Sequence, residues 1–296
     1  ILLIFLLIRS KENTPKKLNN FIWYIPVSII LFVESFSTYS LFGKIGGGAL
    51  HHWQVYISTI ELIKNGGYLL WDVPSQYGFF SIISLVIMPF EDPWLKMYFL
   101  NCILNFILSI ILFKLIWHNG NIYWYLISIF ITCAVYFILA SGPSYANISE
   151  TPSNGALRYF WVVIIAFVLF KYKNLQIERL LLLILPFWII GTLWSIISAF
   201  VINLTLLPIF IYFIFFYQAN FGQKFKIILL YFFVISLTIF AISIYYIINI
   251  GNLPDYLSFF DFAINGIGTS SRLTGVEFNY YGVFLVPILF ISLSLT

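Results

Sequence analysis

Four residues early in the chain have side chains that can act as a general base. Glu34 and Asp72 are carboxylates, and His51 and His52 form an adjacent imidazole pair. A base of either kind can take a proton from an incoming hydroxyl group, and histidine titrates close to neutral pH. The plainer alternatives are a Glu34 carboxylate that reaches the lipid headgroups and a histidine pair that is simply solvated. All four are candidate catalytic residues.

The histidine pair is also the first place to look for a metal site. Adjacent residues of a helix point about 100° apart, and no third ligand stands at a fixed spacing from the pair. The two cysteines, Cys102 and Cys133, both stand inside apolar runs. We therefore predict no metal site and no cofactor, with a divalent metal ion left open as an unsupported alternative.

Two arginines are candidates for holding a phosphate group, because the planar guanidinium fork matches phosphate oxygens. Arg158 stands at the start of an apolar run, directly after the Pro/Ser/Asn/Gly stretch 152–155, where a lipid phosphate is expected to lie. Arg272 lies in the Gly/Ser/Thr-rich stretch 266–275. The alternatives for Arg158 are an ion pair with Glu150 and a side chain that reaches from the membrane to the headgroups.

These residues belong to a composition that excludes a soluble globular protein. Of the 296 residues, 61% are hydrophobic and only 9% are charged, and the mean hydropathy is +0.98. Soluble domains carry roughly 25% charged residues. The net charge of +4 is small, and no basic patch typical of nucleic-acid binding is present. The composition predicts an integral membrane protein with many spans.

The predicted fold is all-α, a polytopic bundle of transmembrane helices that forms a single membrane domain over residues 1–296. A helix needs about 20 apolar residues to cross a bilayer. The runs of suitable length are 21–42, 94–117, 122–140, 158–172, 180–199, 200–217, 227–249 and 277–296. The run 78–90 reaches only ~20 Å and is expected not to cross. Because the sequence opens on Ile1 and stops at Thr296, both inside apolar runs, we expect a fragment truncated at both ends.

The distribution of Lys and Arg predicts the orientation of these spans. If 78–90 does not cross, the basic connections all fall on one side, which the positive-inside rule assigns to the cytoplasm. These basic residues are Arg9, Lys11, Lys16, Lys17, Lys114, Lys171, Lys173, Arg179, Lys224 and Lys226. The outer loops are then 43–93, 141–157 and 250–276. We expect a multi-pass protein of a bacterial or archaeal cytoplasmic membrane, with its functional face outside.

The segment from His51 to Lys64 is predicted to form an amphipathic helix within the first outer loop. Glycines 46–48 are expected to separate this helix from the first span, and Gly66 and Gly67 are expected to end it. One stripe carries Trp53, Tyr56, Ile57, Ile60 and Ile63, and the opposite face carries His51, Gln54, Ser58 and Glu61. Because the helix is too short to span and is apolar on one side, we expect it to lie in the membrane interface.

The sequence WDVPSQYGFF, from Trp71 to Phe80, places an acid, a proline, a glutamine and a Tyr-Gly pair between this helix and a short apolar segment. The order of first span, interfacial helix, GG, acid and QYG resembles the C-type (GT-C) membrane glycosyltransferases, which use lipid-linked sugars. The later stretch SETPSNGALRYFW, from Ser149 to Trp161, adds to the resemblance. The resemblance is one of arrangement, and it covers about residues 21–172.

The resemblance implies a GT-C-like bundle with an extracytoplasmic active site under the first outer loop. Its substrate-binding residues would be Gln76, Tyr77, Glu150, Arg158 and Arg272, and Trp53, Trp71, Tyr77 and Trp161 are candidates for stacking on sugar rings. Family members typically have a catalytic Asp or Glu just before the interfacial helix, where this chain has His51 and His52. We expect a carboxylate base, Glu34 or Asp72, with the histidines positioning substrate; a histidine base is the alternative.

The leading functional prediction is an envelope-glycan glycosyltransferase that moves a sugar from a polyprenyl-phosphate carrier to a glycan, lipid or protein acceptor. Its partners would be the lipid-linked donor, the acceptor and membrane lipids, with no nucleic acid. A lipid-linked oligosaccharide flippase or other transporter is the first alternative, but later spans such as 227–249 lack the polar midplane groups that transporters use. A polysaccharide polymerase or ligase is the second alternative.

Overall fold

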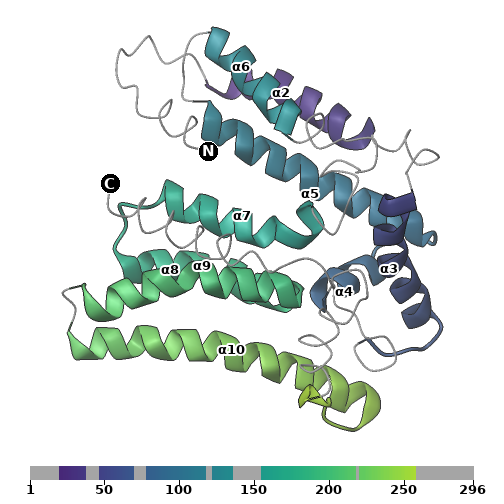
Figure 1. Ribbon diagram of the computed structural model, residues 1–296, viewed down its shortest axis with the longest axis vertical. Helices are drawn as coiled ribbons and strands as arrows, with labels where there is room; N and C mark the ends of the chain where they lie inside the picture. Colours follow the sequence, from purple (N-terminus) through teal and green to yellow (C-terminus); the bar gives the residue numbers. More distant parts are fainter. Residues whose placement is uncertain are drawn as a thin grey trace, which may run out of the picture. The chain divides into compact units, whose positions relative to one another are not determined.

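The computed structural model describes residues 20–37, 47–69, 78–117, 122–135, 155–217 and 220–257 (Figure 1). These residues form nine helices and no sheet, so the all-α prediction is confirmed for this part of the chain. The helices are α2 (Asn20–Ser37), α3 (Gly47–Lys64), α4 (Phe80–Val86), α5 (Pro93–Ile116), α6 (Ile122–Cys133), α7 (Ala156–Lys171), α8 (Ile177–Trp194), α9 (Ile196–Phe215) and α10 (Phe221–Ile250).

Four of the described helices, α5, α8, α9 and α10, are long and apolar enough to cross a membrane. They contain between 18 and 30 residues, which corresponds to lengths of about 27–45 Å. Shorter apolar helices cover Ile22–Phe36 and Ile122–Cys133. The predicted last span, 277–296, lies outside the described residues.

Helix α4 has only seven residues, or a length of about 10 Å. It cannot cross a bilayer, in agreement with the expectation for 78–90. The chain turns after α4, and Asp92 begins α5 by accepting a hydrogen bond from the Trp94 N–H at 2.9 Å. Pro93 occupies the first helical position, where a missing N–H has no consequence.

Helix α3 differs from its predicted start and agrees with its predicted end. It begins at Gly47, so Gly47 and Gly48 lie within its first turn, and the expectation that these glycines separate the helix from the first span is wrong. The helix ends as predicted, because Gly66 adopts a positive φ of 91°. The N–H of Gly67 then donates to the Leu62 carbonyl at 2.9 Å, which completes a Schellman-type end.

The boundary between α8 and α9 lies at Ser195, whereas the apolar runs predicted a boundary after residue 199. Ser195 has an extended backbone, with φ −158° and ψ 159°, and its hydroxyl accepts a hydrogen bond from the Ser198 N–H at 3.0 Å. The serine thereby ends one helix and N-caps the next. Hydrophobicity does not vary at this point, so composition alone misplaced the boundary.

Helix α10 begins six residues before the predicted run 227–249. Asn220 and Gln223 form a capping box, in which the Gln223 N–H donates to the Asn220 side chain at 2.8 Å. The helix ends at Gly251, which adopts the left-handed conformation with φ 80°.

The chain divides into two compact units. Unit 1 comprises Ile1–Glu61 and Ile83–Val163, and unit 2 comprises Leu62–Ile82 and Ile164–Thr296. The single membrane domain over 1–296 stays a prediction.

In unit 1, α2 packs against α5 and α6. Their shared core contains Val27, Leu31, Phe113, Trp117 and Tyr125. The Tyr98 hydroxyl, near the start of α5, donates to the Phe36 carbonyl near the end of α2, and the Tyr125 hydroxyl of α6 donates to the Trp23 carbonyl at 2.7 Å. Helix α2 is therefore antiparallel to α5 and parallel to α6. We call the two ends of this bundle the Phe36 end and the Trp117 end.

In unit 2, α8, α9 and α10 lie side by side (Figure 1). The Trp188 ring of α8 packs on Phe210 of α9 and Tyr231 of α10, at centroid distances of 5.5 and 5.6 Å. Its indole N–H donates to the Asn203 side chain at 3.1 Å. Helices α8 and α9 thus form a hairpin that turns at Ser195. We call the ends of this bundle the Ser195 end and the Lys173 end.

Candidate functional site

The described residues include the side chains of two predicted site residues, Glu34 and Arg158, both in unit 1. His51 and His52 lie in α3, but their side chains are outside the described residues. The other predicted site residues, Asp72, Gln76, Tyr77, Glu150 and Arg272, also lie outside the described residues. Their roles stay predictions.

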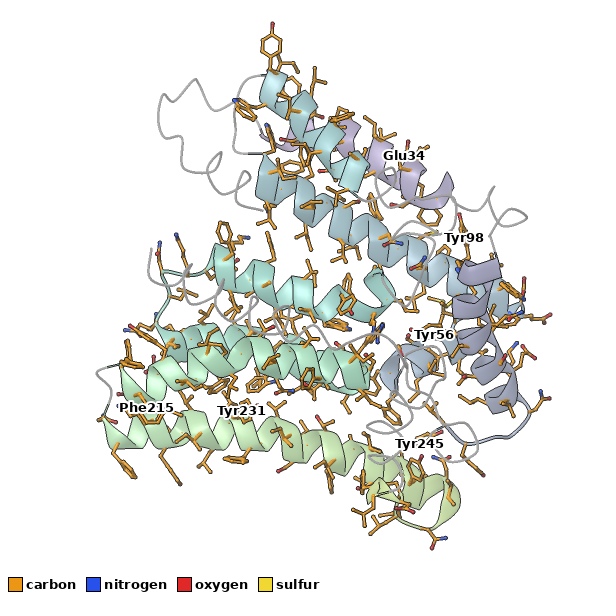
Figure 2. All side chains as sticks on the ribbon, viewed as in Figure 1. Glu34, Tyr56, Tyr98, Phe215, Tyr231 and Tyr245 are labelled. Carbon is orange, nitrogen blue, oxygen red and sulfur yellow. The ribbon has the colours of Figure 1, made fainter. Side chains whose placement is uncertain are left out.

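Glu34 lies in the last turn of α2, at the Phe36 end of unit 1. Figure 2 shows it at the same end as Tyr98, whose hydroxyl bonds to the Phe36 carbonyl. The carboxylate is half-buried and lies within electrostatic range of the Cys133 thiol, at the end of α6. An ionisable side chain in the last turn of an apolar helix is a functional candidate, because such groups are rare in membrane segments and often functional.

Helix α3 packs onto the start of α5 at this same end. The Trp53 ring stacks on Trp94 at a centroid distance of 6.1 Å and an interplanar angle of 16°. His51 and His52 directly precede Trp53 in the helix. The end of α2, the start of α5 and the histidine-bearing helix are therefore neighbours within unit 1.

The amphipathic pattern of α3 is confirmed, but its apolar stripe is covered by protein. Trp53, Tyr56, Ile57 and Ile60 are at most 8% exposed, whereas Gln54 and Ser58 on the other face are exposed. Protein side chains therefore bury this stripe, and the expectation that the helix lies in the membrane interface stays a prediction. Trp53, at 3% exposure, is also not accessible for stacking on a sugar ring.

Arg158 lies in the first turn of α7, as its place after a Pro/Gly-rich stretch predicts. Its backbone N–H donates to the Gly155 carbonyl at 3.2 Å, and its guanidinium carbon stands 5.7 Å from the centre of the Tyr159 ring. The side chain is half-buried. A cation at the N-terminus of a helix adds to a positive field that favours phosphate.

In unit 2, the chain on both sides of 70–77 is attached to the Ser195 end of the bundle. The Tyr246 hydroxyl of α10 donates to the Leu69 carbonyl at 2.9 Å. On the other side, the Phe79 N–H donates to the Trp194 carbonyl at 3.2 Å, and the Phe79 ring contacts Tyr245 at 5.2 Å. Each contact joins residues more than one hundred positions apart in the sequence.

Helix α5 carries a buried cation and a polar face that were not predicted from the sequence. Lys96 is only 3% exposed, and its ammonium donates to the Val86 carbonyl in the last turn of α4 at 2.7 Å. Asn101, Asn105 and Ser109 are buried along one face of the same helix. The spacing of four residues between these polar side chains, inside an apolar run, was the sequence signal that could have predicted the polar face. Among the described residues, no three His, Cys, Asp or Glu side chains form a group that could hold a metal ion.

Comparisons of the chain with protein-family models, with curated proteins and with solved structures find no match. A functional assignment therefore comes from the residues and contacts of this chain itself.

Proposed function

We propose that the chain is a multi-pass membrane glycosyltransferase that moves a sugar from a polyprenyl-phosphate carrier to an extracytoplasmic acceptor in envelope glycan assembly. The observation that carries the proposal is the gathering, at the Phe36 end of unit 1, of Glu34, the histidine-bearing helix α3 and the start of α5. Helices α3 and α4 come between apolar helices in the chain, and neither is a candidate span. Such non-spanning segments place polar groups at the membrane surface, where a lipid phosphate lies.

The proposed chemistry needs a base for the acceptor hydroxyl and positive charge for the departing phosphate. The acceptor oxygen bonds to the anomeric carbon of the sugar as the sugar–phosphate bond breaks and the carrier phosphate leaves. Glu34 or Asp72 takes the hydroxyl proton, while His51 and His52 position the substrate. Arg158 holds the phosphate, and Arg272 stays a predicted substrate-binding residue. Gln76, Tyr77 and Glu150 complete the substrate-binding set.

The charge distribution of unit 2 supports the proposed orientation. Lys171 ends α7, Lys173 lies in the connection to α8, Arg179 lies in the first turn of α8, and Lys224 and Lys226 lie in the first two turns of α10. Both groups lie at the Lys173 end, opposite the hydrogen bonds that attach Leu69 and Phe79 to the bundle. By the positive-inside rule the Lys173 end faces the cytoplasm, so the Ser195 end is extracytoplasmic.

A second candidate function, lipid-linked oligosaccharide transport, is favoured by one specific observation. Asn101 and Asn105 are 2% and 1% exposed in the middle of α5, a candidate span. Transporters commonly carry polar groups near the bilayer midplane, whereas a surface glycosyltransferase does not need them there.

Reconstitution of the full chain in vesicles with a polyprenyl-phosphate-linked sugar distinguishes the two functions. Transfer predicts a new covalent product that contains the sugar without the carrier, detected by mass spectrometry, whereas transport predicts an intact carrier that changes leaflet.

Glu34→Gln or Asp72→Asn should abolish transfer, with membrane insertion checked. If His51→Ala or His52→Ala loses transfer activity while both carboxylate variants keep it, and the wild-type rate falls below about pH 6.5, the base is a histidine of α3. Full transfer activity in all four variants would contradict the proposed site.

A further inference from the structure

The connections α7–α8 and α9–α10 lie at the same end of unit 2. The α8–α9 hairpin turns at Ser195, so the start of α8 and the end of α9 are both at the other end. The Lys224 ammonium, in the first turn of α10, donates to the Ile214 carbonyl near the end of α9, which places the start of α10 at that end as well. This Lys173 end is a single surface built from two connections.

The charges of unit 2 are unevenly divided between its two ends. The Lys173 end carries Lys171, Lys173, Arg179, Lys224 and Lys226 against one acid, Glu178. At the Ser195 end, the described residues carry one charge of each sign, Lys64 and Asp255. The Lys173 end is therefore strongly cationic.

Two of these five cations are held by the protein. The Lys171 ammonium stands 5.0 Å from the centre of the Tyr172 ring and 5.9 Å from that of Phe167. Lys224 donates to the Ile214 carbonyl, in the last turn of α9, at 2.7 Å. These contacts hold the Lys171 side chain at the end of α7 and the Lys224 side chain against the end of α9.

The other three cations, Lys173, Arg179 and Lys226, are exposed and make no ion pair within the described part of the chain. Lys173 lies between α7 and α8, Arg179 in the first turn of α8 and Lys226 in the second turn of α10, so the three donors are distributed over this end and do not belong to a single turn. A group of cations without ion pairs on one surface attracts a multivalent anionic surface more strongly than it attracts a single small anion.

Large exposed aromatic side chains surround these cations. Phe215, Phe216 and Phe221 are 73%, 71% and 83% exposed, and Tyr212 and Phe225 are at least half exposed. Figure 2 labels Phe215 at the end of α9. Two parallel ring pairs, Tyr212–Phe216 and Phe221–Phe225, continue this apolar surface. Water disfavours such an array, whereas the boundary between headgroups and acyl chains accommodates it.

We propose that the Lys173 end of unit 2 is a docking surface for anionic phospholipid headgroups. Lys173, Arg179 and Lys226 bind the lipid phosphates, and the exposed rings insert beside them at the level of the glycerol backbone. A lipid leaflet fits better than a soluble anion or a nucleic acid, because the same surface offers cations and immersed rings at the ends of long apolar helices. The inference requires α8–α10 to span a bilayer and is independent of sugar transfer.

The test measures thermal unfolding of the full chain in neutral detergent, with phosphatidylglycerol or phosphatidylcholine titrated into the micelles. A ligand of the folded state raises the unfolding temperature, so phosphatidylglycerol should stabilise the protein at much lower concentration. Removing one cation should weaken this apparent affinity about fivefold, and the triple variant Lys173→Gln/Arg179→Gln/Lys226→Gln about one hundredfold.

Two controls make the outcome decisive. Lys64→Gln removes an exposed lysine at the Ser195 end and should leave the phosphatidylglycerol affinity unchanged. If the triple variant does not fold, the three single variants replace it. Equal stabilisation by both lipids, or wild-type affinity in the cation variants, would overturn the proposal. The same stabilisation by inorganic phosphate at equal concentration would also overturn it, because the site would then bind a soluble anion.

Discussion

The backbone of Gly78 lies directly against the turn between α8 and α9, so closely that a β-carbon on Gly78 would stand 2.1 Å from the Trp194 carbonyl oxygen. The same hypothetical carbon would lie 2.7 Å from the Ser195 α-carbon. Both neighbours are backbone atoms and cannot move aside as a flexible side chain can. The φ of 128° at Gly78 is in the region that only glycine adopts readily.

Gly78→Ala is therefore expected to destabilise the protein strongly. The unfavourable φ alone costs about 1–3 kcal/mol, and displacing the α8–α9 turn adds a further cost of about 1–3 kcal/mol. Gly66→Ala is the matched control, since Gly66 also has a positive φ, 91°, but has no neighbouring atom within 4 Å. Thermal unfolding in detergent should show a clearly larger loss for Gly78→Ala. Equal losses of stability in the two variants would mean that the close approach of Gly78 to Trp194 does not contribute to the effect.

Tyr246→Phe removes only the hydroxyl that donates to the Leu69 carbonyl at 2.9 Å. Because this bond is buried, its loss should lower the free energy of unfolding by about 1–3 kcal/mol. Tyr231→Phe is the control on the same helix, since the Tyr231 ring packs on Trp188 and Phe210 and loses no ring contact. Unfolding temperatures of the two variants compare them directly, and a similar effect of both would contradict a specific role for the Leu69 bond.

Lys96→Met should destabilise α4 more than Lys224→Met destabilises the end of α9. Each lysine donates, at 2.7 Å, to a carbonyl ten residues earlier, in the last turn of the preceding helix. Lys96 is 3% exposed, whereas Lys224 is half-buried, so water replaces the lost donor only at the second site. The expected loss is about 1–3 kcal/mol for Lys96→Met and under about 1 kcal/mol for Lys224→Met.

Unfolding temperature measures both losses, and Lys96→Arg should recover part of the stability because it restores a cationic donor. No recovery in Lys96→Arg, together with equal losses in the two methionine variants, would show that burial of the Lys96 ammonium does not matter.

Single cysteines report the orientation of unit 2, in a Cys102→Ser/Cys133→Ser background. Cysteines at Gly67 and Asn252 should label from one side of sealed vesicles, because Leu69 is bonded to Tyr246 near the end of the same helix that precedes Asn252. A cysteine at Lys173 should label from the opposite side. If α4 does not cross the membrane, a cysteine at Asp92 should label from the same side as the cysteine at Gly67. Labelling of these two positions from opposite sides would refute the proposed topology.

Arg158→Lys should impair sugar transfer even though it keeps the positive charge. The ammonium lacks the planar fork that binds two phosphate oxygens at once, so we expect a loss of about tenfold or more, with a larger loss for Arg158→Ala. Insertion and unfolding temperature serve as controls for folding. Full transfer activity in a correctly inserted Arg158→Ala variant would remove this residue from the proposed phosphate site.

The sequence by itself determined the class of this fold, because membrane helices depend mainly on local composition and length. The apolar runs correctly placed α5 and excluded a crossing by α4, and Gly66 correctly ended α3. The periodicity of Trp53 and Tyr56 identified the buried face of α3, since a 3.6-residue period needs no distant partner.

Only the tertiary structure decided what that face packs against and which distant residues meet. A stripe of apolar residues has the same sequence whether lipid or protein covers it, and in α3 protein covers it, with Trp53 stacked on Trp94. The break at Ser195, the approach of Gly78 to Trp194 and the bond from Tyr246 to Leu69 join segments that no local pattern connects. The physical reason is that an apolar surface favours a helix in the membrane without specifying its neighbour or its register, whereas one serine cap, one missing β-carbon and one buried hydroxyl do specify them.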